Sequence, residues 1–191
     1  MKNVALVIVD MQKDFVLPNA PACVKGAFKT IPKLKEALDF FRLKKLPIFH
    51  VIREYLDDAS NVENFRVKDF RNGEKYVVKG TKGAEIIDEL KPIDGEYVII
   101  KPRFSAFMNT ELEFILKRLN IKTLVICGTQ YPNCIRATVF DAVCYDYDVY
   151  LLTDATSAQT DEIAEANIID IKNIGVNCLS VDEFKRIFKK N

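Results

Sequence analysis

Asp10, Lys101 and Cys134 each follow an apolar run of the sequence, directly or after a short turn, and could act together on a carbonyl group. A cysteine thiolate is a nucleophile, and a carboxylate can take the thiol proton and later give it to a leaving amine. A nearby ammonium group stabilises negative charge on sulfur. The three residues therefore have the chemistry of a nucleophile with its own acid and base.

The stretch GTQYPNC, residues 128–134, joins the apolar run 124–127 to a helical pattern. A free thiol has a pKa of about 8.5 and is mostly protonated near neutral pH, so a catalytic cysteine needs help to ionise. If Asn133 caps the helix and Cys134 opens it, the positive end of the helix favours the thiolate, and Lys101 acts in the same direction. We therefore expect the pKa of Cys134 to be lowered.

Each of these residues also has a structural interpretation. An aspartate after a strand can cap a turn, and a single lysine is most often a solvated surface residue. His50, the only histidine, lies inside a strand-like run, so a cysteine–histidine pair is poorly supported. The other cysteines are expected to be packed thiols on apolar faces, apart from one in a proline-rich loop; they are Cys127, Cys144, Cys178 and, in the loop, Cys23. Only the joint pattern favours a catalytic role.

The elements that would position these residues alternate along the chain. Helical periodicity appears in residues 31–41, 112–119 and 140–147. Short apolar runs between these segments are typical of strands covered on both faces; they are residues 4–9, 47–52, 97–100, 123–127, 149–152 and 176–179. This order predicts a three-layer α/β/α sandwich with a mostly parallel central sheet of about six strands, formed by one domain over residues 1–191. In such a sheet the ligand crevice lies beyond the carboxyl ends of the strands.

The composition and net charge of the chain argue against some classes of binding partner. The chain has 28 basic and 27 acidic residues and a formal charge of +1, so no overall field favours nucleic acid or an anionic membrane. The run 4–9 is too short to span a membrane, and five cysteines without CxxC pairs indicate reduced thiols. We expect a cytoplasmic protein that acts on a small-molecule substrate, with no nucleic-acid or membrane partner.

One segment interrupts the alternation. Residues 54–76 are charged and irregular, and long connections at the carboxyl edge of a parallel sheet usually shape the ligand site. The sequence leaves two interpretations open for this segment, a lid over the site or an oligomer contact.

Five blocks of the chain together resemble the isochorismatase-like cysteine hydrolase superfamily, which includes nicotinamidases and N-carbamoylsarcosine amidases. The blocks occur in the family's order and are ALVIVDMQKDF (5–15), KGTKGAEIIDEL (79–90), IIKPRFSAFMNTEL (99–112), GTQYPNCIRATVFDA (128–142) and VYLLTDATSA (149–158). The resemblance implies a Rossmann-like fold with a catalytic triad of Asp10, Lys101 and Cys134. It also implies a cis peptide bond between Thr129 and Gln130, an oxyanion hole formed by the backbone N–H groups of Gln130 and Cys134, and a homo-oligomer.

The chain also departs from part of this family. Nicotinamidases of the family hold a metal with one aspartate and two histidines, and a single histidine cannot supply that pair. We therefore expect no metal and no cofactor. Proximity to the matched blocks suggests five residues that could line the substrate pocket: Phe15, Arg53, Phe104, Tyr131 and Arg136.

The leading hypothesis is a metal-independent cysteine hydrolase that cleaves a C–N bond of a small amide, imide or carbamoyl compound through an acyl-enzyme on Cys134. One alternative is a redox sensor, because an exposed thiol of low pKa is easily oxidised. Another is an oligomeric protein with a vestigial site. A third is a vinyl ether hydrolase of the isochorismatase type, whose chemistry does not require the thiol.

Overall fold

The computed structural model describes residues 3–190, which form a six-stranded sheet in which every neighbouring pair is parallel. The strand order is β3-β2-β1-β4-β5-β6. The strands are β1 (Val4–Val9), β2 (Ile48–Arg53), β3 (Tyr97–Lys101), β4 (Thr123–Thr129), β5 (Asp148–Ser157) and β6 (Asn177–Leu179). The predicted strands are all present, so the expected sheet is confirmed.

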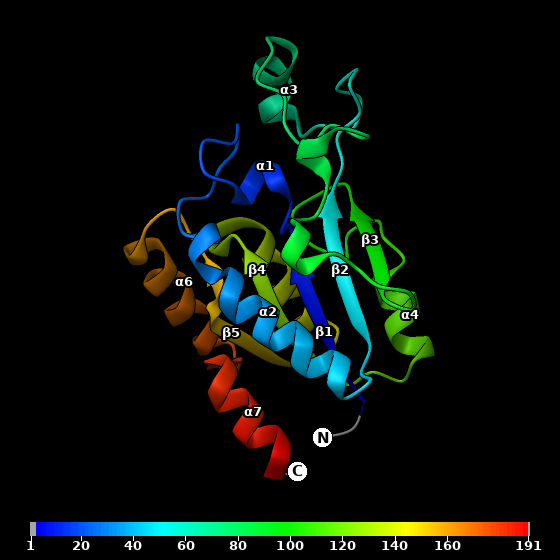
Figure 1. Ribbon diagram of the computed structural model, residues 1–191, viewed down its shortest axis with the longest axis vertical. Helices are drawn as coiled ribbons and strands as arrows, with labels where there is room; N and C mark the ends of the chain where they lie inside the picture. Colours follow the sequence, from blue (N-terminus) through cyan, green and yellow to red (C-terminus); the bar gives the residue numbers. More distant parts are fainter. Residues whose placement is uncertain (1–2, 191) are drawn as a thin grey trace.

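Helices cover both faces of the sheet and complete the predicted three-layer sandwich (Figure 1). They are α1 (Lys13–Val16), α2 (Ala27–Leu43), α3 (Asn64–Arg71), α4 (Leu112–Arg118), α5 (Arg136–Cys144), α6 (Asp161–Asn173) and α7 (Val181–Lys190). Three short turns accompany them: η1 (Lys82–Ala84), η2 (Asp88–Leu90) and the π-helical segment η3 (Tyr131–Ile135). Helices α2 and α7 pack on one face, and α4, α5 and α6 pack on the other.

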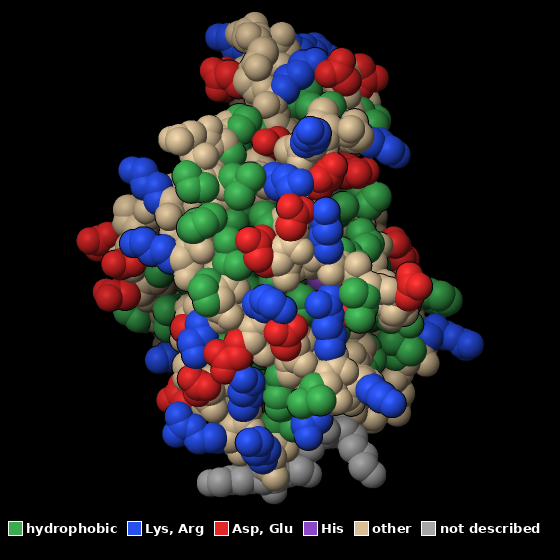
Figure 2. Space-filling view, viewed as in Figure 1, with side chains coloured by type: hydrophobic (Ala, Val, Ile, Leu, Met, Phe, Trp, Pro, Cys, Tyr) green, Lys and Arg blue, Asp and Glu red, His purple; other side chains and the backbone are tan. Residues whose placement is uncertain are grey.

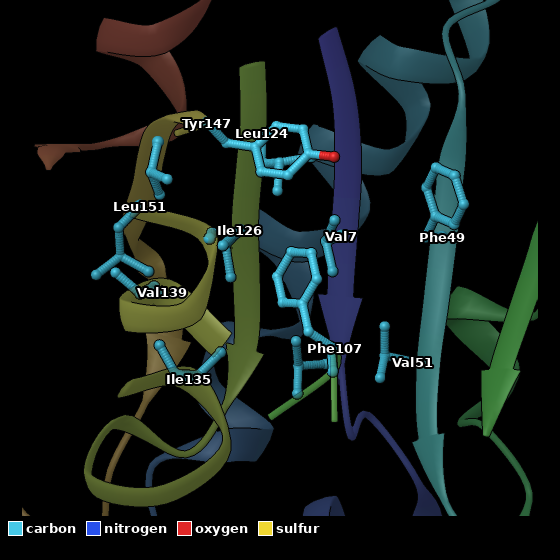
Figure 3. Packing of buried hydrophobic residues seen from close by; sticks show 14 of the residues in the cluster. Val7, Phe49, Val51, Phe107, Leu124, Ile126, Ile135, Val139, Tyr147 and Leu151 are labelled. Atoms are coloured by element: carbon cyan, nitrogen blue, oxygen red, sulfur yellow. The ribbon is translucent and has the colours of Figure 1, made fainter. Parts of the chain in front are cut away.

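The central strand β1 explains why its sequence lacks polar alternation. Successive side chains of a strand point to opposite faces, and both faces are covered here. Val7 belongs to the core that includes Val139 of α5 and Leu112 of α4, whereas Leu6 belongs to the core that includes Leu38 of α2. Figure 3 shows the first of these two cores, with Val7 among side chains from β2, β4, β5 and α5.

Residues 54–78, called here the α3 lobe, project beyond the carboxyl ends of the strands at the top of Figure 1. The lobe has a small apolar core of its own, in which Tyr55, Val62, Phe70 and Val77 are buried. Backbone hydrogen bonds from Tyr55 to Val77 and from Lys79 to Tyr55 tie its two ends together. The irregular segment of the sequence is therefore an ordered structure beside the strand ends.

The surface carries charges of both signs in close mixture, as Figure 2 shows for one face. This distribution agrees with the formal charge of +1. None of the helices within residues 3–190 combines the length and the apolar character that crossing a membrane requires.

Candidate active site

The structure brings Asp10, Lys101 and Cys134 together at the carboxyl edge of the sheet. Asp10 directly follows β1, Lys101 ends β3, and Cys134 lies in η3 after β4. The ammonium Nζ of Lys101 lies 2.8 Å from Oδ2 of Asp10 and 3.3 Å from Sγ of Cys134. All three side chains are buried, so the ion pair and the thiol share one largely desolvated environment.

The backbone at the strand ends explains this convergence. Gly128 of β4 has a φ of +118°, and a Cβ atom at this position would lie 2.1 Å from the carbonyl oxygen of Val9 in β1. Only glycine permits such a close approach of two backbones. Asp10 then leaves β1 with a φ of 53° and donates its N–H to the carbonyl of Val51 at 2.8 Å. The close approach of β1 and β4 therefore places Asp10 and the turn that holds Cys134 next to each other.

The turn that holds Cys134 differs from the predicted cap. The helical conformation begins at Tyr131, so Gln130 occupies the N-cap position and Cys134 lies inside η3. The backbone N–H of Asn133 donates to the carbonyl of Gln130 at 3.2 Å, and no side-chain capping bond forms at this end. The expectation that Asn133 caps a helix opened by Cys134 is therefore wrong. The peptide bond between Thr129 and Gln130 is cis.

The expected direction of the shift in the Cys134 pKa is also wrong. Burial raises the pKa of Cys134 to about 11, and the negative charge of Asp10 acts in the same direction. Lys101 and Arg53 lower the pKa but do not outweigh burial. In the resting protein the thiol therefore keeps its proton near neutral pH.

Cys134 and Asp10 open onto a small cavity. Three of the predicted lining residues, Phe15, Arg53 and Phe104, line this cavity. The other residues of its wall are Val24, Arg66, Thr129, Gln130 and Asn133. Arg66 belongs to α3, so the α3 lobe forms part of the cavity wall.

The two remaining pocket predictions are wrong. Tyr131 is fully buried in the core on the α5 side of the sheet, and its hydroxyl faces the carbonyl of Thr153. Arg136 points away from the cavity, because its guanidinium pairs with Asp170 of α6 at 2.6 Å and covers the ring of Phe140. Both residues are close to Cys134 in sequence, but the helical turn directs their side chains elsewhere.

A buried network around Arg53 was missed by sequence reasoning. The guanidinium of Arg53 pairs through Nη1 with Glu63 of the α3 lobe, and its Nη2 lies 3.8 Å from Sγ of Cys134. The hydroxyl of Tyr55 also donates to Glu63, while Arg66 donates to Tyr55 at 2.9 Å. Although burial raises the pKa of Glu63, the charge of Arg53, the hydrogen bond from Tyr55 and the charge of Arg66 act together against it, and the pKa lies below its usual range. The only sequence signal was the acid–base spacing of Glu63 and Arg66, which is common on exposed helices.

Gln12 fixes the backbone that carries Arg53. Its side-chain amide donates to the carbonyl of Arg53 at 2.7 Å and accepts from the N–H of Arg53 at 2.8 Å. The same amide donates to Ala84 of η1 at 2.8 Å. Because Gln12 is fully buried, the position of Arg53 at the end of β2 is determined by both its backbone and its side-chain partners.

His50 and the other cysteines lie outside this cavity. His50 is buried within β2, and its Nε2 lies 2.8 Å from a carboxylate oxygen of Glu96. The described residues contain no group of three or more histidine, cysteine, aspartate or glutamate side chains arranged to hold a metal ion. Cys127 is buried as expected, whereas Cys144 is exposed because it ends α5 at the surface.

Comparisons with known proteins agree with this architecture. A family model described as "Isochorismatase domain" matches residues 4–183. The chain is 43% identical over 187 residues to a protein of Arabidopsis thaliana named as a probable inactive nicotinamidase, covering 96% of this chain and 95% of that protein. Among solved structures, it resembles an isochorismatase family protein from Desulfovibrio vulgaris, with a TM-score of 0.95, 46% identity and 98% of each chain covered. It also resembles an N-carbamoylsarcosine amidase from Thermoplasma acidophilum, with a TM-score of 0.80, 28% identity, and 94% of this chain and 97% of that chain covered.

Proposed function

This chain belongs to the isochorismatase-domain family, and from that premise we propose that it is a metal-independent cysteine hydrolase. It cleaves a C–N bond of a small amide, imide or carbamoyl compound through an acyl-enzyme on Cys134. The observation that carries the proposal is the contact of one buried ammonium, that of Lys101, with both the Cys134 sulfur and the Asp10 carboxylate at the wall of a cavity. The likeness to an N-carbamoylsarcosine amidase supports C–N bond cleavage.

In the first step, the sulfur of Cys134 attacks the carbonyl carbon of the substrate. Oδ1 of Asp10 is buried without a hydrogen-bond partner in the described part of the chain, so it can accept the thiol proton. Because the pKa of the resting thiol is about 11, the proton leaves as the S–C bond forms rather than before. The carbonyl electron pair moves to oxygen, and the backbone N–H groups of Gln130 and Cys134 stabilise the resulting oxyanion.

In the second step, Asp10 returns the proton to the leaving nitrogen, the C–N bond breaks, and a thioester remains on Cys134. A water molecule then attacks the thioester and gives its proton to Asp10. The C–S bond breaks, the carboxyl product leaves, and the proton returns to sulfur. Throughout the cycle Lys101 holds Asp10 in place and compensates the negative charge that alternates between carboxylate and sulfur.

The alternative roles have weaker support. A redox sensor requires a thiol that ionises readily, whereas burial keeps the pKa of Cys134 at about 11. A vinyl ether hydrolase does not require the thiol, so it does not explain the contacts of Cys134 with Lys101 and Arg53. A vestigial site is consistent with the name of the Arabidopsis thaliana relative, but here the acid, the cation and the nucleophile are all present.

The test is a screen of small amides, ureido compounds and imides with the unmodified chain and with Cys134→Ala and Cys134→Ser. We expect both variants to lose turnover while their circular dichroism spectra stay unchanged. Mass spectrometry of acid-quenched reactions should detect an acyl group on the peptide that contains Cys134. Turnover that survives in Cys134→Ala would refute the proposal.

A further inference from the structure

We propose that the substrate of this site carries a carboxylate, bound by Arg53 and Arg66, only a few bonds from the carbonyl that Cys134 attacks. This proposal rests on the proposed hydrolase function and names its substrate class: short amides or ureido compounds that bear a carboxylate. Nothing in the triad itself requires such a group. The requirement comes from the guanidinium groups of Arg53 and Arg66, which both line the cavity.

The charges of the side chains around the sulfur do not balance. Two carboxylates, Asp10 and Glu63, face three cations, Lys101, Arg53 and Arg66. Transfer of the thiol proton to Asp10 moves negative charge onto sulfur but leaves this total unchanged. Charges in a largely buried site are normally compensated, so one positive charge remains for a ligand to neutralise.

The geometry of Arg53 leaves one of its edges free for a ligand. Glu63 and Tyr55 both contact Nη1, the hydroxyl of Tyr55 at 3.1 Å, and hold the guanidinium in place. Nη2 lies beside the sulfur of Cys134 and has no carboxylate partner among the described residues. A carboxylate that accepts from Nη2 therefore lies close to the carbon that the sulfur attacks.

Arg66 supplies the second cation from the α3 lobe. Its guanidinium and that of Arg53 each lie 5.4 Å from the centroid of the Phe104 ring, and both side chains line the cavity. Arg66 is only 3.5 Å from Glu63, but Glu63 is already paired with Arg53. A carboxylate between the two guanidinium groups would complete the charge balance.

The size and the remaining wall of the cavity favour a small carboxylate over other anions. The cavity beside the Cys134 sulfur is small, so only a compact ligand can reach the carbon-attack position. Phe15 and Val24 make part of its wall apolar, which suits a short carbon chain. A single uncompensated positive charge matches a monoanion, whereas a phosphate monoester carries nearly two negative charges at pH 7.

Alkylation of Cys134 tests this preference without requiring turnover. Iodoacetate and iodoacetamide are similar in size and differ in charge; in both reactions sulfur displaces iodide, the S–C bond forms, and the thiol proton passes to Asp10. The ratio of the two rates at one pH does not depend on the fraction of thiolate. We expect the iodoacetate-to-iodoacetamide ratio at Cys134, measured by peptide mass spectrometry, to exceed the ratio for N-acetylcysteinamide by at least tenfold. A ratio equal to or below that of the model thiol would overturn the proposal.

Two variants of Arg66 locate the effect. Arg66→Gln removes the charge and should lower the iodoacetate-to-iodoacetamide ratio at least threefold. Arg66→Lys keeps the charge, so most of the preference for iodoacetate should remain. Both variants alter a half-buried side chain of the α3 lobe, and the measurement on the unmodified chain decides the proposal even if a variant does not fold. An unchanged ratio in folded Arg66→Gln would exclude Arg66 from the carboxylate site.

A pair of substrates separates this proposal from the hydrolase proposal. Succinamate and succinamide have nearly the same shape, and only the first carries a carboxylate. We expect kcat/KM for succinamate to exceed that for succinamide by at least tenfold. Equal turnover of both compounds would keep the hydrolase and overturn the carboxylate site. If neither compound were hydrolysed, the result would count against the hydrolase proposal. The alkylation ratio alone would then test the carboxylate site.

Discussion

Substitution of Gly128 by alanine is expected to damage both stability and the site. A Cβ atom at Gly128 would lie 2.1 Å from the carbonyl oxygen and 2.7 Å from the nitrogen of Val9. These are backbone atoms of a central strand, so no flexible side chain can move aside. Either β1 and β4 separate locally or the turn toward Cys134 shifts.

The magnitude follows from two contributions. Alanine at positive φ costs about 1–2 kcal/mol, and forcing an extra carbon into a packed interior costs about 1–3 kcal/mol. Gly128→Ala should therefore lower the free energy of unfolding by about 2–5 kcal/mol. Gly73 provides a matched control, because its φ is +107° and no atom beyond its two chain neighbours lies within 4 Å of its hypothetical Cβ. Gly73→Ala should cost only the conformational part, about 1–2 kcal/mol.

The assay is urea unfolding of both variants and the unmodified chain, followed by fluorescence and circular dichroism to check that the transition has two states. The difference between the two variants isolates the contact with Val9 from the backbone conformation. If Gly128→Ala were no more destabilising than Gly73→Ala, the close approach of β1 and β4 would not have the energetic role assigned to it. Amide turnover of folded Gly128→Ala should also fall, because Asp10 directly follows Val9.

Two further predictions concern charge. Asp10→Asn removes a negative charge that raises the pKa of the Cys134 thiol, so that pKa should fall, and turnover should be lost because the proton acceptor is gone. The pKa can be measured from the pH dependence of iodoacetamide alkylation, and an unchanged or higher value would contradict the assignment. For Glu96, burial raises the pKa, but hydrogen bonds from Arg42 and His50 outweigh it and lower the pKa to about 2. A depressed folded-state pKa contributes stability above the unfolded-state pKa, about 3 kcal/mol at pH 7, and this contribution is lost as the pH falls from about 4.5 to 2. Glu96→Gln should therefore destabilise the protein in urea at pH 7 much more than at pH 2.5, and an equal loss at both pH values would refute the assignment.

The fold was predictable because hydrophobic periodicity reports directly on burial. The run of residues 4–9 has no polar position, and in the structure every residue of β1 is buried between two helical layers. The order of strands and helices then places the carboxyl ends together, which is why Asp10, Lys101 and Cys134 could be selected as a group.

The details of the site depend on contacts that are distant in sequence. Arg66 reaches the cavity only because the α3 lobe folds back over the strand ends, and no local pattern encodes that path. The direction of the Cys134 pKa was mispredicted because nearby charges can be read from residue types, whereas the degree of burial is set by packing of several segments. Tyr131 and Arg136 were misassigned because closeness in sequence does not fix the direction of a side chain on a helical turn.

The register of β1 with β4, in which Val9 is paired with Gly128, has a consequence for protein synthesis. A ribosome releases Asp10 well before Cys134, and the two meet only after the middle of the chain has been made and the central strands have paired. A chain in which β1 and β4 have not yet paired therefore displays an ordinary thiol that is separated from its base. Catalytic competence would appear only once these two strands have paired, so measured turnover would report the fraction of molecules in which β1 and β4 are joined.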